Sequence, residues 1–402
     1  MTASSQSSNS AISPQSYRFL ALYALAWAGG AVAYVPFLTI LLPVRVTALT
    51  GADDISWLAY ATFFGAVTAS VSNIAFGWAS DLTQTRRPWV LAGLSVTIIM
   101  FAVIAVVDDP VSLIGAILLW QVGLNMMLAP LAAWAGDRVP NAQKGILGGL
   151  TALAPAVGAV AGIIVTMPGL AGATGRLAVV ATMVCALILP VVLAGGQSGT
   201  TVTGDDAGLS HKVVQVTLGR VMVVLWLARL AIQVAEAALF AYLLFYFRSL
   251  DPNFRDADVA RIFGGVLIVT VPIALLSGRW MDRSHRPVLA LLICAIIAAV
   301  GLALMAVAAQ LGVALAGYII FGMGSAVFLA LHSGQTLRVL YHSERRGRSL
   351  GVFNLTNTIP SLIVPWLTLL IVPNFGFAPL IWLLATLSFA AALLLTTIVR
   401  QR

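Results

Sequence analysis

Long apolar runs follow one another along almost the whole chain, and they constrain its fold more than any other feature. A helical run of about 18 or more apolar residues can cross a hydrocarbon core about 30 Å thick. The chain is 60% hydrophobic and 9% charged, whereas a soluble domain carries about 25% charged residues. The sequence therefore predicts an all-α membrane protein with twelve transmembrane helices, at 18–43, 56–79, 89–107, 111–135, 146–168, 177–195, 218–247, 260–278, 288–308, 312–337, 349–372 and 377–399.

The sequence also contains a polar N-terminal segment and two cysteines. Residues 1–17 are polar and rich in Ser and Gln, and we expect a short disordered tail. The apolar run after them is too long for a signal-peptide core, so it is interpreted as an uncleaved signal anchor. Cys185 and Cys294 lie in separate apolar runs, which gives neither a disulfide framework nor a metal-ligand spacing. We expect no metal, no cofactor and a monomer.

The basic residues are distributed unevenly between the two sets of alternating loops. Of the 22 Lys and Arg, 16 fall in the tails and in the loops that contain residues 80–88, 137–144, 196–220, 279–287 and 338–348. Cytoplasmic loops carry the excess of Lys and Arg. We therefore expect both termini in the cytoplasm and the protein in the cell membrane, which is the inner membrane if the source is bacterial. The net charge of +8 then reports topology, and no nucleic-acid partner is expected.

A sequence pattern recurs at about half the chain length. The segment "GWASDLTQTRRPWVLAG" begins at Gly77 and "GRWMDRSHRPVLA" begins at Gly278, 201 residues later. Asp81 and Asp282 differ by the same 201 residues, and "DRVPNAQKG" from Asp137 is echoed by "LRVLYHSERRGRSLG" from Leu337. Such a period indicates duplication. We predict a tail at 1–17, a six-helix bundle at 18–195, a Gly/Ser/Thr/Asp-rich linker at 196–217 and a second six-helix bundle at 218–402.

The paired loops resemble the signature of the major facilitator superfamily. Each has the pattern G-x-x-x-D followed by basic residues, and each lies between the second and third helix of a six-helix half. The resemblance covers almost the entire chain. It implies two bundles that rock about a site near the bilayer midplane, with the first, fourth, seventh and tenth helices lining a cavity.

Two stretches are similar to the glycoside and sucrose:cation symporter group within that superfamily. They are "SDLTQTRRPWVLAG" and "GRSLGVFNLTNTIPSLIVP", the second of which resembles the eleventh helix of those symporters. The chain also departs from the group. Sugar symporters of this kind usually carry carboxylates or an arginine in their first-half helices, and none lies inside the first five runs.

The paired loops are candidate cytoplasmic gates. A carboxylate such as Asp81 at a helix end can accept backbone hydrogen bonds or pair with Arg86 or Arg87, and such charge-assisted contacts are strong but reversible. If they form only when the cytoplasmic side is closed, they favour one state. The alternative is that they are ordinary positively charged anchors. The candidate gate residues are Gly77, Asp81, Arg86, Arg87, Gly278, Asp282 and Arg286.

The seventh run carries a polar stripe at its centre, in "WLARLAIQVAEAALF". At about 100° per residue, Arg229, Gln233 and Glu236 project from one helix face. An ionised side chain at this depth costs at least about 2.5 kcal/mol and is by default a sign of function. We predict that Glu236 accepts a proton and that Arg229 either tunes that carboxyl group or holds the solute. The alternative is an Arg–Glu pair that only fixes helix packing, with separate partners on other helices if the two side chains do not meet.

Other candidate solute-binding residues each have a structural alternative. Gln121 and Asn125, four apart, suit hydroxyl or amide recognition or interhelical hydrogen bonding. His332 could titrate, although a hydrogen-bonding role at the helix end is preferred. Asn357 could line the site or, together with Asn354, satisfy backbone groups freed by Pro360. Trp27 and Tyr34 could stack on a solute ring or belong to a lipid-facing or core stripe.

These features favour a proton-coupled secondary active transporter of a small polar organic solute, including sugar-like solutes, with symport preferred over antiport. The alternative is a proton-antiporting exporter of amphipathic compounds, because 17 Phe, 10 Trp and 10 Met could build a greasy, adaptable pocket. The "ALAPAVGAVAG" stretch only partly matches the drug-antiporter pattern, and we expect its small residues to serve helix packing. A membrane-embedded enzyme is disfavoured because the four histidines are dispersed and no nucleophile or nucleotide motif is present.

Overall fold

The computed structural model describes residues 15–194, 215–284, 287–340 and 346–399, and every element in these ranges is helical. The predicted linker at 196–217 lies almost wholly outside the described residues. The elements are α1 (Tyr17–Pro36), η1 (Phe37–Leu41), α2 (Leu42–Thr50), η2 (Gly51–Asp53), α3 (Asp54–Leu82), α4 (Arg87–Val106), α5 (Pro110–Arg138), α6 (Asn141–Thr151), α7 (Ala154–Val165), α8 (Gly175–Ala194), α9 (Gln215–Leu250), α10 (Asp256–Ser284), α11 (Pro287–Ala306), α12 (Leu311–Leu340), α13 (Arg346–Phe375) and α14 (Phe377–Val399).

Eleven helical segments among the described residues are long and apolar enough to cross a membrane. The first of them, Tyr17–Leu82, spans 66 residues and accounts for two crossings. It turns at Gly51, whose φ of 58° lies in the left-handed region that favours glycine. Across the turn, Thr47 Oγ1 donates to Asp54 Oδ2 at 2.8 Å, which ties the end of α2 to the start of α3. The predicted twelve-helix membrane fold is therefore confirmed.

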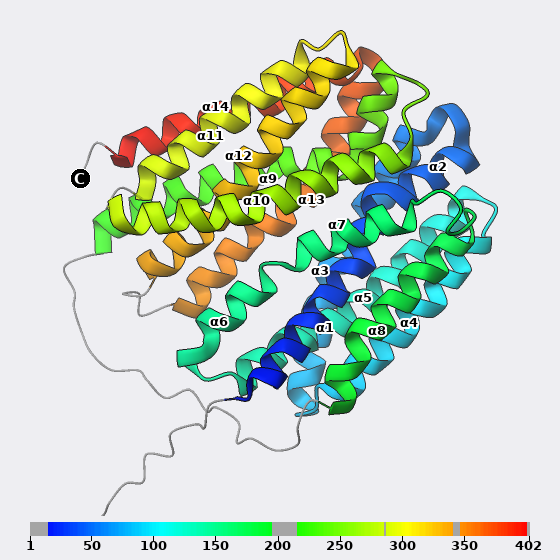
Figure 1. The fold of residues 1–402 in the computed structure, drawn as a ribbon, viewed down its shortest axis with the longest axis horizontal. Coiled ribbons are helices and arrows are strands. Elements are labelled where there is room, and N and C mark those ends of the chain that lie inside the picture. The colour runs from blue at the N-terminus through cyan, green and yellow to red at the C-terminus, as the bar shows by residue number, and fades with distance from the viewer. Residues whose placement is uncertain (1–14, 195–214, 285–286, 341–345, 400–402) are drawn as a thin grey trace, which may run out of the picture.

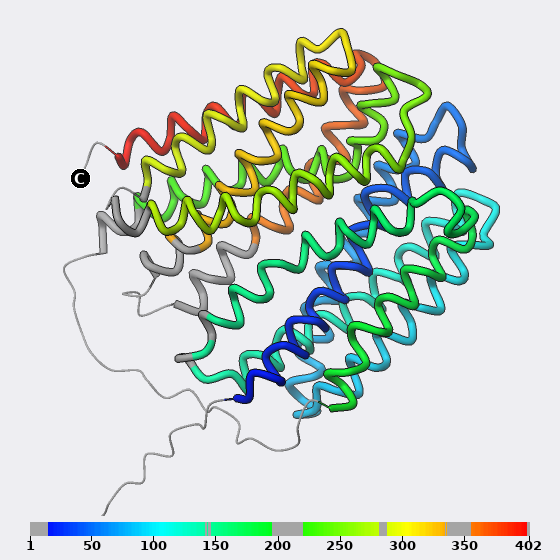
Figure 2. Tube along the Cα trace, viewed as in Figure 1, coloured from blue at the N-terminus to red at the C-terminus, as the bar shows by residue number. Residues whose placement is uncertain are grey.

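The order and length of the helices repeat between the two halves of the chain. The succession α3, α4, α5 has 29, 20 and 29 residues, and α10, α11, α12 has 29, 20 and 30. Helices α4 and α11 begin 200 residues apart, at Arg87 and Pro287. Figure 2 allows both paths to be followed as two groups of helices that lie side by side. The duplication inferred from the paired loops is thus visible in the helices themselves.

Two of the predicted helices are broken, and proline explains each break. The run expected at 18–43 continues to Thr50 and contains the π-helical turn η1 directly after Pro36. Proline has no N–H and cannot complete the regular α-helical pattern. The run expected at 146–168 is divided into α6 and α7, because Pro155 favours the first turn of a new helix.

Small residues let neighbouring helices approach closely inside each bundle. A Cβ built on Gly93 of α4 would lie 2.4 Å from Met127 N of α5, and one on Gly301 of α11 would lie 2.3 Å from Phe321 N of α12. In the "ALAPAVGAVAG" stretch, a Cβ on Gly158 would lie 2.9 Å from Val35 Cβ. The expected packing role of that stretch is confirmed.

The two bundles, α1–α8 and α9–α14, diverge from one end of the molecule (Figure 1). We call the end that holds Tyr17, Ala194, Gln215 and Val399 the terminal side, and the opposite end the distal side. The bundles pack through α3 against α13 and through α7 against α10. This arrangement places the interface of the two halves along the centre of the molecule.

Candidate functional site

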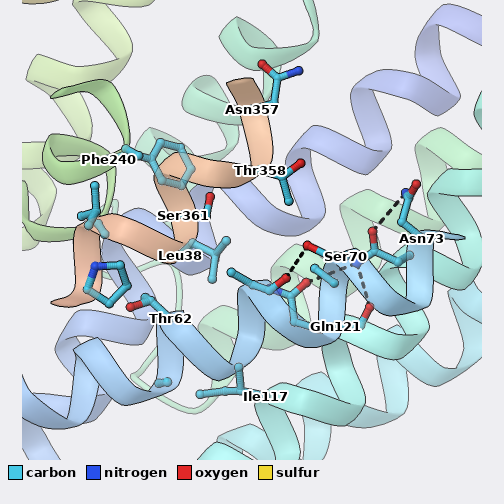
Figure 3. A pocket seen from close by; sticks show the side chains of 18 of the residues that line it. Leu38, Thr62, Ser70, Asn73, Ile117, Gln121, Phe240, Asn357, Thr358 and Ser361 are labelled. Carbon is cyan, nitrogen blue, oxygen red and sulfur yellow. Dashed lines mark hydrogen bonds between the residues drawn. The ribbon is translucent and has the colours of Figure 1, made fainter. Parts of the chain in front are cut away.

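A cavity of about 700 Å³ lies between the two bundles. Its walls come from η1, α3 and α5 of the first bundle and from α9 and α13 of the second. The lining side chains described in the structure include no charged group. The polar ones carry amides or hydroxyls: Thr62, Ser70, Asn73, Gln121, Asn125, Tyr242, Asn357, Thr358 and Ser361. Figure 3 shows the labelled side chains of α3 and α13 around this space.

The helices that line the cavity differ in part from the expected set. The first, fourth and seventh crossings contribute, as the family resemblance implied, but the tenth, α12, contributes no described lining residue. The second and eleventh crossings, α3 and α13, contribute instead. They pack directly against each other across the bundle interface, whereas α12 packs mainly against α11 inside the second bundle.

The cavity is closed on the distal side. Thr62 Oγ1 lies 3.4 Å from Tyr242 OH, and the rings of Phe63 and Trp366 meet at 5.2 Å between centroids. Except for Ala61, the other cavity residues of α3 lie on the terminal side of these contacts, as do those of α13. The structure is therefore that of a distally closed state.

A chain of amides forms the first-bundle wall. Gln121 and Asn125 are each 8% exposed. Asn73 Nδ2 donates to Asn125 Oδ1 at 3.3 Å, and Asn125 Nδ2 donates to the backbone oxygen of Gln121 at 2.9 Å. The dashed lines in Figure 3 mark these contacts. Gln121 and Asn125 lie on one face of α5, as their spacing predicts, and both line the cavity. Asn73 of α3 lies next to them.

Arg229 lies in the second bundle and holds residues from two other helices. Its Nε donates to Thr356 Oγ1 at 3.1 Å and its Nη1 to Ser333 Oγ at 3.0 Å. Its Nη2 donates to Asn357 Oδ1 at 3.3 Å, and Gln233 Nε2 donates to the same oxygen at 2.8 Å. Asn357 lines the cavity. Arg229 and Gln233 therefore reach the cavity through Asn357.

Glu236 has a partner of its own and makes no ion pair with Arg229 within the described residues. Its Oε1 accepts a hydrogen bond from Ser325 Oγ of α12 at 2.9 Å. The backbone oxygen of Gly322 lies 3.3 Å from the same hydroxyl. The next residue, Ala237, lines the cavity, whereas the carboxylate of Glu236 points to α12 and is not part of the described lining. Of the two open alternatives, the structure has the one with separate partners on other helices.

His332 is fully buried between α12 and α9. Its Nε2 lies 2.9 Å from the backbone oxygen of Leu225, and its Nδ1 lies 3.4 Å from Arg229 Nη1. The neutral tautomer that carries its proton on Nε2 satisfies both contacts, because it donates to the carbonyl and accepts from the arginine. The preferred hydrogen-bonding role agrees with this geometry, and His332 does not line the cavity.

Trp27 and Tyr34 lie in aromatic contacts outside the described cavity wall. The ring of Trp27 stacks on that of Tyr23, with centroids 6.4 Å apart. The ring of Tyr34 contacts Phe240, which does line the cavity, at 6.5 Å. Their placement corresponds to the core-stripe alternative, and Tyr34 adds to the contacts between the bundles.

The loop between α3 and α4 forms a cluster around Arg86. Its guanidinium pairs with Asp81 at 2.6 Å and with Asp137 of α5 at 2.8 Å, and it donates to Ser80 Oγ at 2.6 Å. Burial lowers the pKa of Arg86, but hydrogen bonds with Asp137 and Asp81 outweigh that effect, so the net pKa is raised. The pair is present although the contacts described above close the distal side.

The other candidate gate residues lie around that cluster or in the second half. Arg87 lies over the ring of Trp134, 5.5 Å from its centroid. A Cβ on Gly77 would meet open space, and one on Gly278 would be in ordinary contact with Leu331. The side chain of Asp282 and the whole of Arg286 lie outside the described residues.

Sequence reasoning missed Asn73, Ser70, Thr358 and Ser361 in the cavity and Asp137 in the Arg86 cluster. Ser70 and Asn73 are three apart in an apolar run, as are Thr358 and Ser361, and this spacing places each pair on one helix face. Such uncharged polar pairs within apolar runs were the feature of the sequence that could have predicted these cavity residues. The described residues contain no group of three His, Cys, Asp or Glu that could hold a metal ion.

Two six-helix bundles around a cavity that is closed on the distal side and lined by amides, hydroxyls and apolar side chains define a membrane transport protein. The chain belongs to the Major Facilitator Superfamily, whose sequence model matches residues 19–339 and 262–402. No curated protein matches the sequence.

Solved structures with the same fold are distant in sequence. One is a bacterial homolog of the human lysosomal transporter Spinster in an inward-facing and unoccupied conformation, with 13% identity, a TM-score of 0.67 and 94% of each chain covered. Another is a variant of the nucleoside transporter NupG, with 14% identity, a TM-score of 0.70 and coverage of 94% of this chain and 99% of that one. At these identities the likeness shows the fold.

Proposed function

We propose that the protein is a proton-coupled symporter of a small, neutral, hydroxyl-bearing solute such as a sugar or a nucleoside. The observation that carries this proposal is the set of uncharged amides and hydroxyls that both bundles contribute to a cavity wall whose other described lining residues are apolar. Amides and hydroxyls both donate and accept hydrogen bonds, which matches the hydroxyl groups of such a solute. A charged solute would require an opposite charge in the wall.

The same lining contains few of the side chains expected in the pocket of an exporter of amphipathic compounds. An adaptable greasy pocket would draw on Met, Trp and Phe. The aromatic side chains in the described lining are Phe240 and Tyr242, and no Met or Trp joins them. The nucleoside transporter among the structural neighbours makes nucleosides a second class to test beside sugars.

We propose Glu236 as the proton-coupling residue. Ionised, its carboxylate accepts from the Ser325 hydroxyl. Protonated, it can donate to Ser325 Oγ, because the hydroxyl proton can then turn to the backbone oxygen of Gly322. Ser325 is therefore a hydrogen-bond partner of Glu236 in both protonation states, which a residue that gains and loses a proton needs.

The test is transport by the full-length protein in proteoliposomes. Glu236→Gln should abolish uphill accumulation driven by a proton gradient and should retain counterflow exchange of the same sugar or nucleoside, because glutamine mimics the protonated carboxyl. Ser325→Ala is the matched control, since it removes the hydrogen-bond partner but leaves the titrating group, and it should keep uphill accumulation. Proton-driven accumulation by Glu236→Gln would show the assignment to be wrong. Dye efflux without counterflow of any sugar or nucleoside would support the exporter.

We also propose that the Arg86 cluster acts during conformational exchange, with the terminal side in the cytoplasm as the basic loops indicate. Arg86 ties the ends of α3 and α5 together, so these ends would move as one unit. Asp81→Asn should slow counterflow turnover several-fold and leave solute affinity unchanged, because the cluster is at the terminal end and not in the cavity wall. Unchanged turnover would contradict a gating role.

A further inference from the structure

A second and much smaller cavity lies at the distal end of the first bundle. Its volume is about 70 Å³, and all of its lining residues belong to the first bundle. Two of them are Arg45 of α2 and Arg176, at the start of α8. Most of the remaining wall is apolar, from Phe37, Leu41, Val44, Ile104, Ala105 and Leu177. We call this space the arginine pocket.

Arg45 brings a positive charge to the pocket without a carboxylate partner among the described residues. Its Nη2 donates to the backbone oxygens of Ala105 and Val107, at the C-terminal end of α4. Its Nε is buried and bonds to none of the described residues. The carbonyls at a helix end supply only part of a negative charge, whereas a cation held away from water needs a full counter-charge.

Arg176 lies between the pocket and the second bundle. Its Nη1 forms an ion pair with Asp256 at the start of α10, and this pair joins the two bundles on the distal side. Its Nε, like that of Arg45, is buried and without a partner in the described part of the chain. Two cations, each with a buried N–H donor, therefore border one small space. Among the described ion pairs, Asp256 neutralises Arg176 and not Arg45.

We propose that the arginine pocket binds one small monovalent anion such as chloride, held by Arg45 and Arg176. Room for one water molecule corresponds to about 10–15 Å³ of volume measured in this way, so the pocket can hold a small monovalent anion together with a few water molecules. Guanidinium donors in an apolar surrounding provide the charge-assisted hydrogen bonds that an anion requires.

The ion pair with Asp256 makes anion binding depend on conformation. Asp256 belongs to the second bundle, so its carboxylate leaves Arg176 when the bundles part on the distal side. The anion stays with the first bundle and supplies the missing counter-charge. Asp256 therefore opposes anion binding in the closed state, and a bound anion favours the distally open state. This site does not depend on which solute the central cavity carries.

The experiment measures the thermal unfolding temperature of the full-length protein in an uncharged detergent. Chloride or bromide replaces gluconate at constant ionic strength. Wild-type protein should show a saturable rise, and Arg45→Gln should raise the half-saturating concentration about tenfold or more, as loss of a charged hydrogen bond does. Arg255→Gln is the matched control, because Arg255 is an exposed distal arginine that pairs with Asp258, and it should behave as wild type.

A second variant tests the proposal through an effect that simple loss of structure would not produce. Asp256→Asn should lower the half-saturating halide concentration several-fold, because it removes the carboxylate that opposes the anion. Bromide diffraction from wild-type crystals should give an anomalous peak between Arg45 and Arg176, which keeps the test open if Arg45→Gln fails to fold. The proposal is overturned by a wild-type protein with no saturable halide response, by equal responses in wild type and Arg45→Gln, or by stabilisation that follows added phosphatidylglycerol and not halide.

Discussion

At the scale of single residues, Asn357 connects the polar stripe of α9 to the central cavity. Its Oδ1 accepts from both Arg229 and Gln233, and its side chain lines the cavity. Two donors on one oxygen fix the orientation of the amide, because the oxygen must face them. We therefore propose that Arg229 positions the Asn357 amide and that a solute contacts Asn357 rather than Arg229.

The Arg229→Ala variant should weaken solute binding about tenfold, since the Asn357 amide would lose a charged hydrogen bond worth about 1.5 kcal/mol. The effect should appear in the half-saturating solute concentration of counterflow. Ser333→Ala is the control, because Ser333 also contacts Arg229 but does not line the cavity, and it should retain wild-type affinity. Wild-type affinity in Arg229→Ala would make Arg229 a purely structural residue.

At the scale of helices, glycines set the distance between α4 and α5 in the first bundle and between α11 and α12 in the second. Gly93 packs against the backbone of α5, and Gly301 packs against the backbone of α12. These contacts are between main chains, so no side-chain rotation can relieve an added methyl group. In a bilayer, where the hydrophobic effect does not drive helices together, such close packing is a main source of association energy.

Alanine at either glycine should therefore lower the thermal unfolding temperature of the detergent-solubilised protein. The expected loss is about 1–3 kcal/mol for each of Gly93→Ala and Gly301→Ala, as for overpacking elsewhere. Gly115→Ala provides the comparison, because its Cβ would meet nothing within 4 Å, and it should unfold at the wild-type temperature or slightly above it. Equal unfolding temperatures for all three variants would contradict the packing argument.

At the scale of the whole molecule, contacts between the bundles close the distal side. The ion pair of Arg176 with Asp256 and the rings of Phe63 and Trp366 lie on the distal side. An ion pair of this exposure is worth on the order of 1 kcal/mol. That energy is enough to shift the ratio of two conformations about fivefold.

Reversing the charge at one partner should open the distal side, and reversing both should close it again. Arg176→Asp should increase the fraction of long distances between spin labels at Gly172→Cys and Asn253→Cys, with Cys185 and Cys294 replaced by alanine. Arg176→Asp with Asp256→Arg should restore the short distances. Arg255→Asp, which breaks a pair inside one bundle, should leave them unchanged. Wild-type distances in Arg176→Asp would show that the ion pair does not control closure.

Several features of the site were predictable because they depend on local chemistry. Arg229 and Glu236 are isolated charges in an apolar run, and Gln121 and Asn125 share a helix face by their spacing. The partners of those residues were not predictable. Ser325, Thr356 and Asn357 are ordinary polar residues in sequence, and only the packing of α12 and α13 against α9 brings them to the stripe.

The sequence by itself determined the membrane fold, the number of crossings, the repeated halves and the residues that are costly to bury. Each follows from the length and composition of a run, which are properties of a segment alone. The tertiary structure decided that α3 and α13 line the cavity, that Arg229 and Glu236 have separate partners, and that Asp256 meets Arg176 on the closed side. Those outcomes depend on how each helix is rotated and tilted against its neighbours, and contacts between distant segments set that rotation.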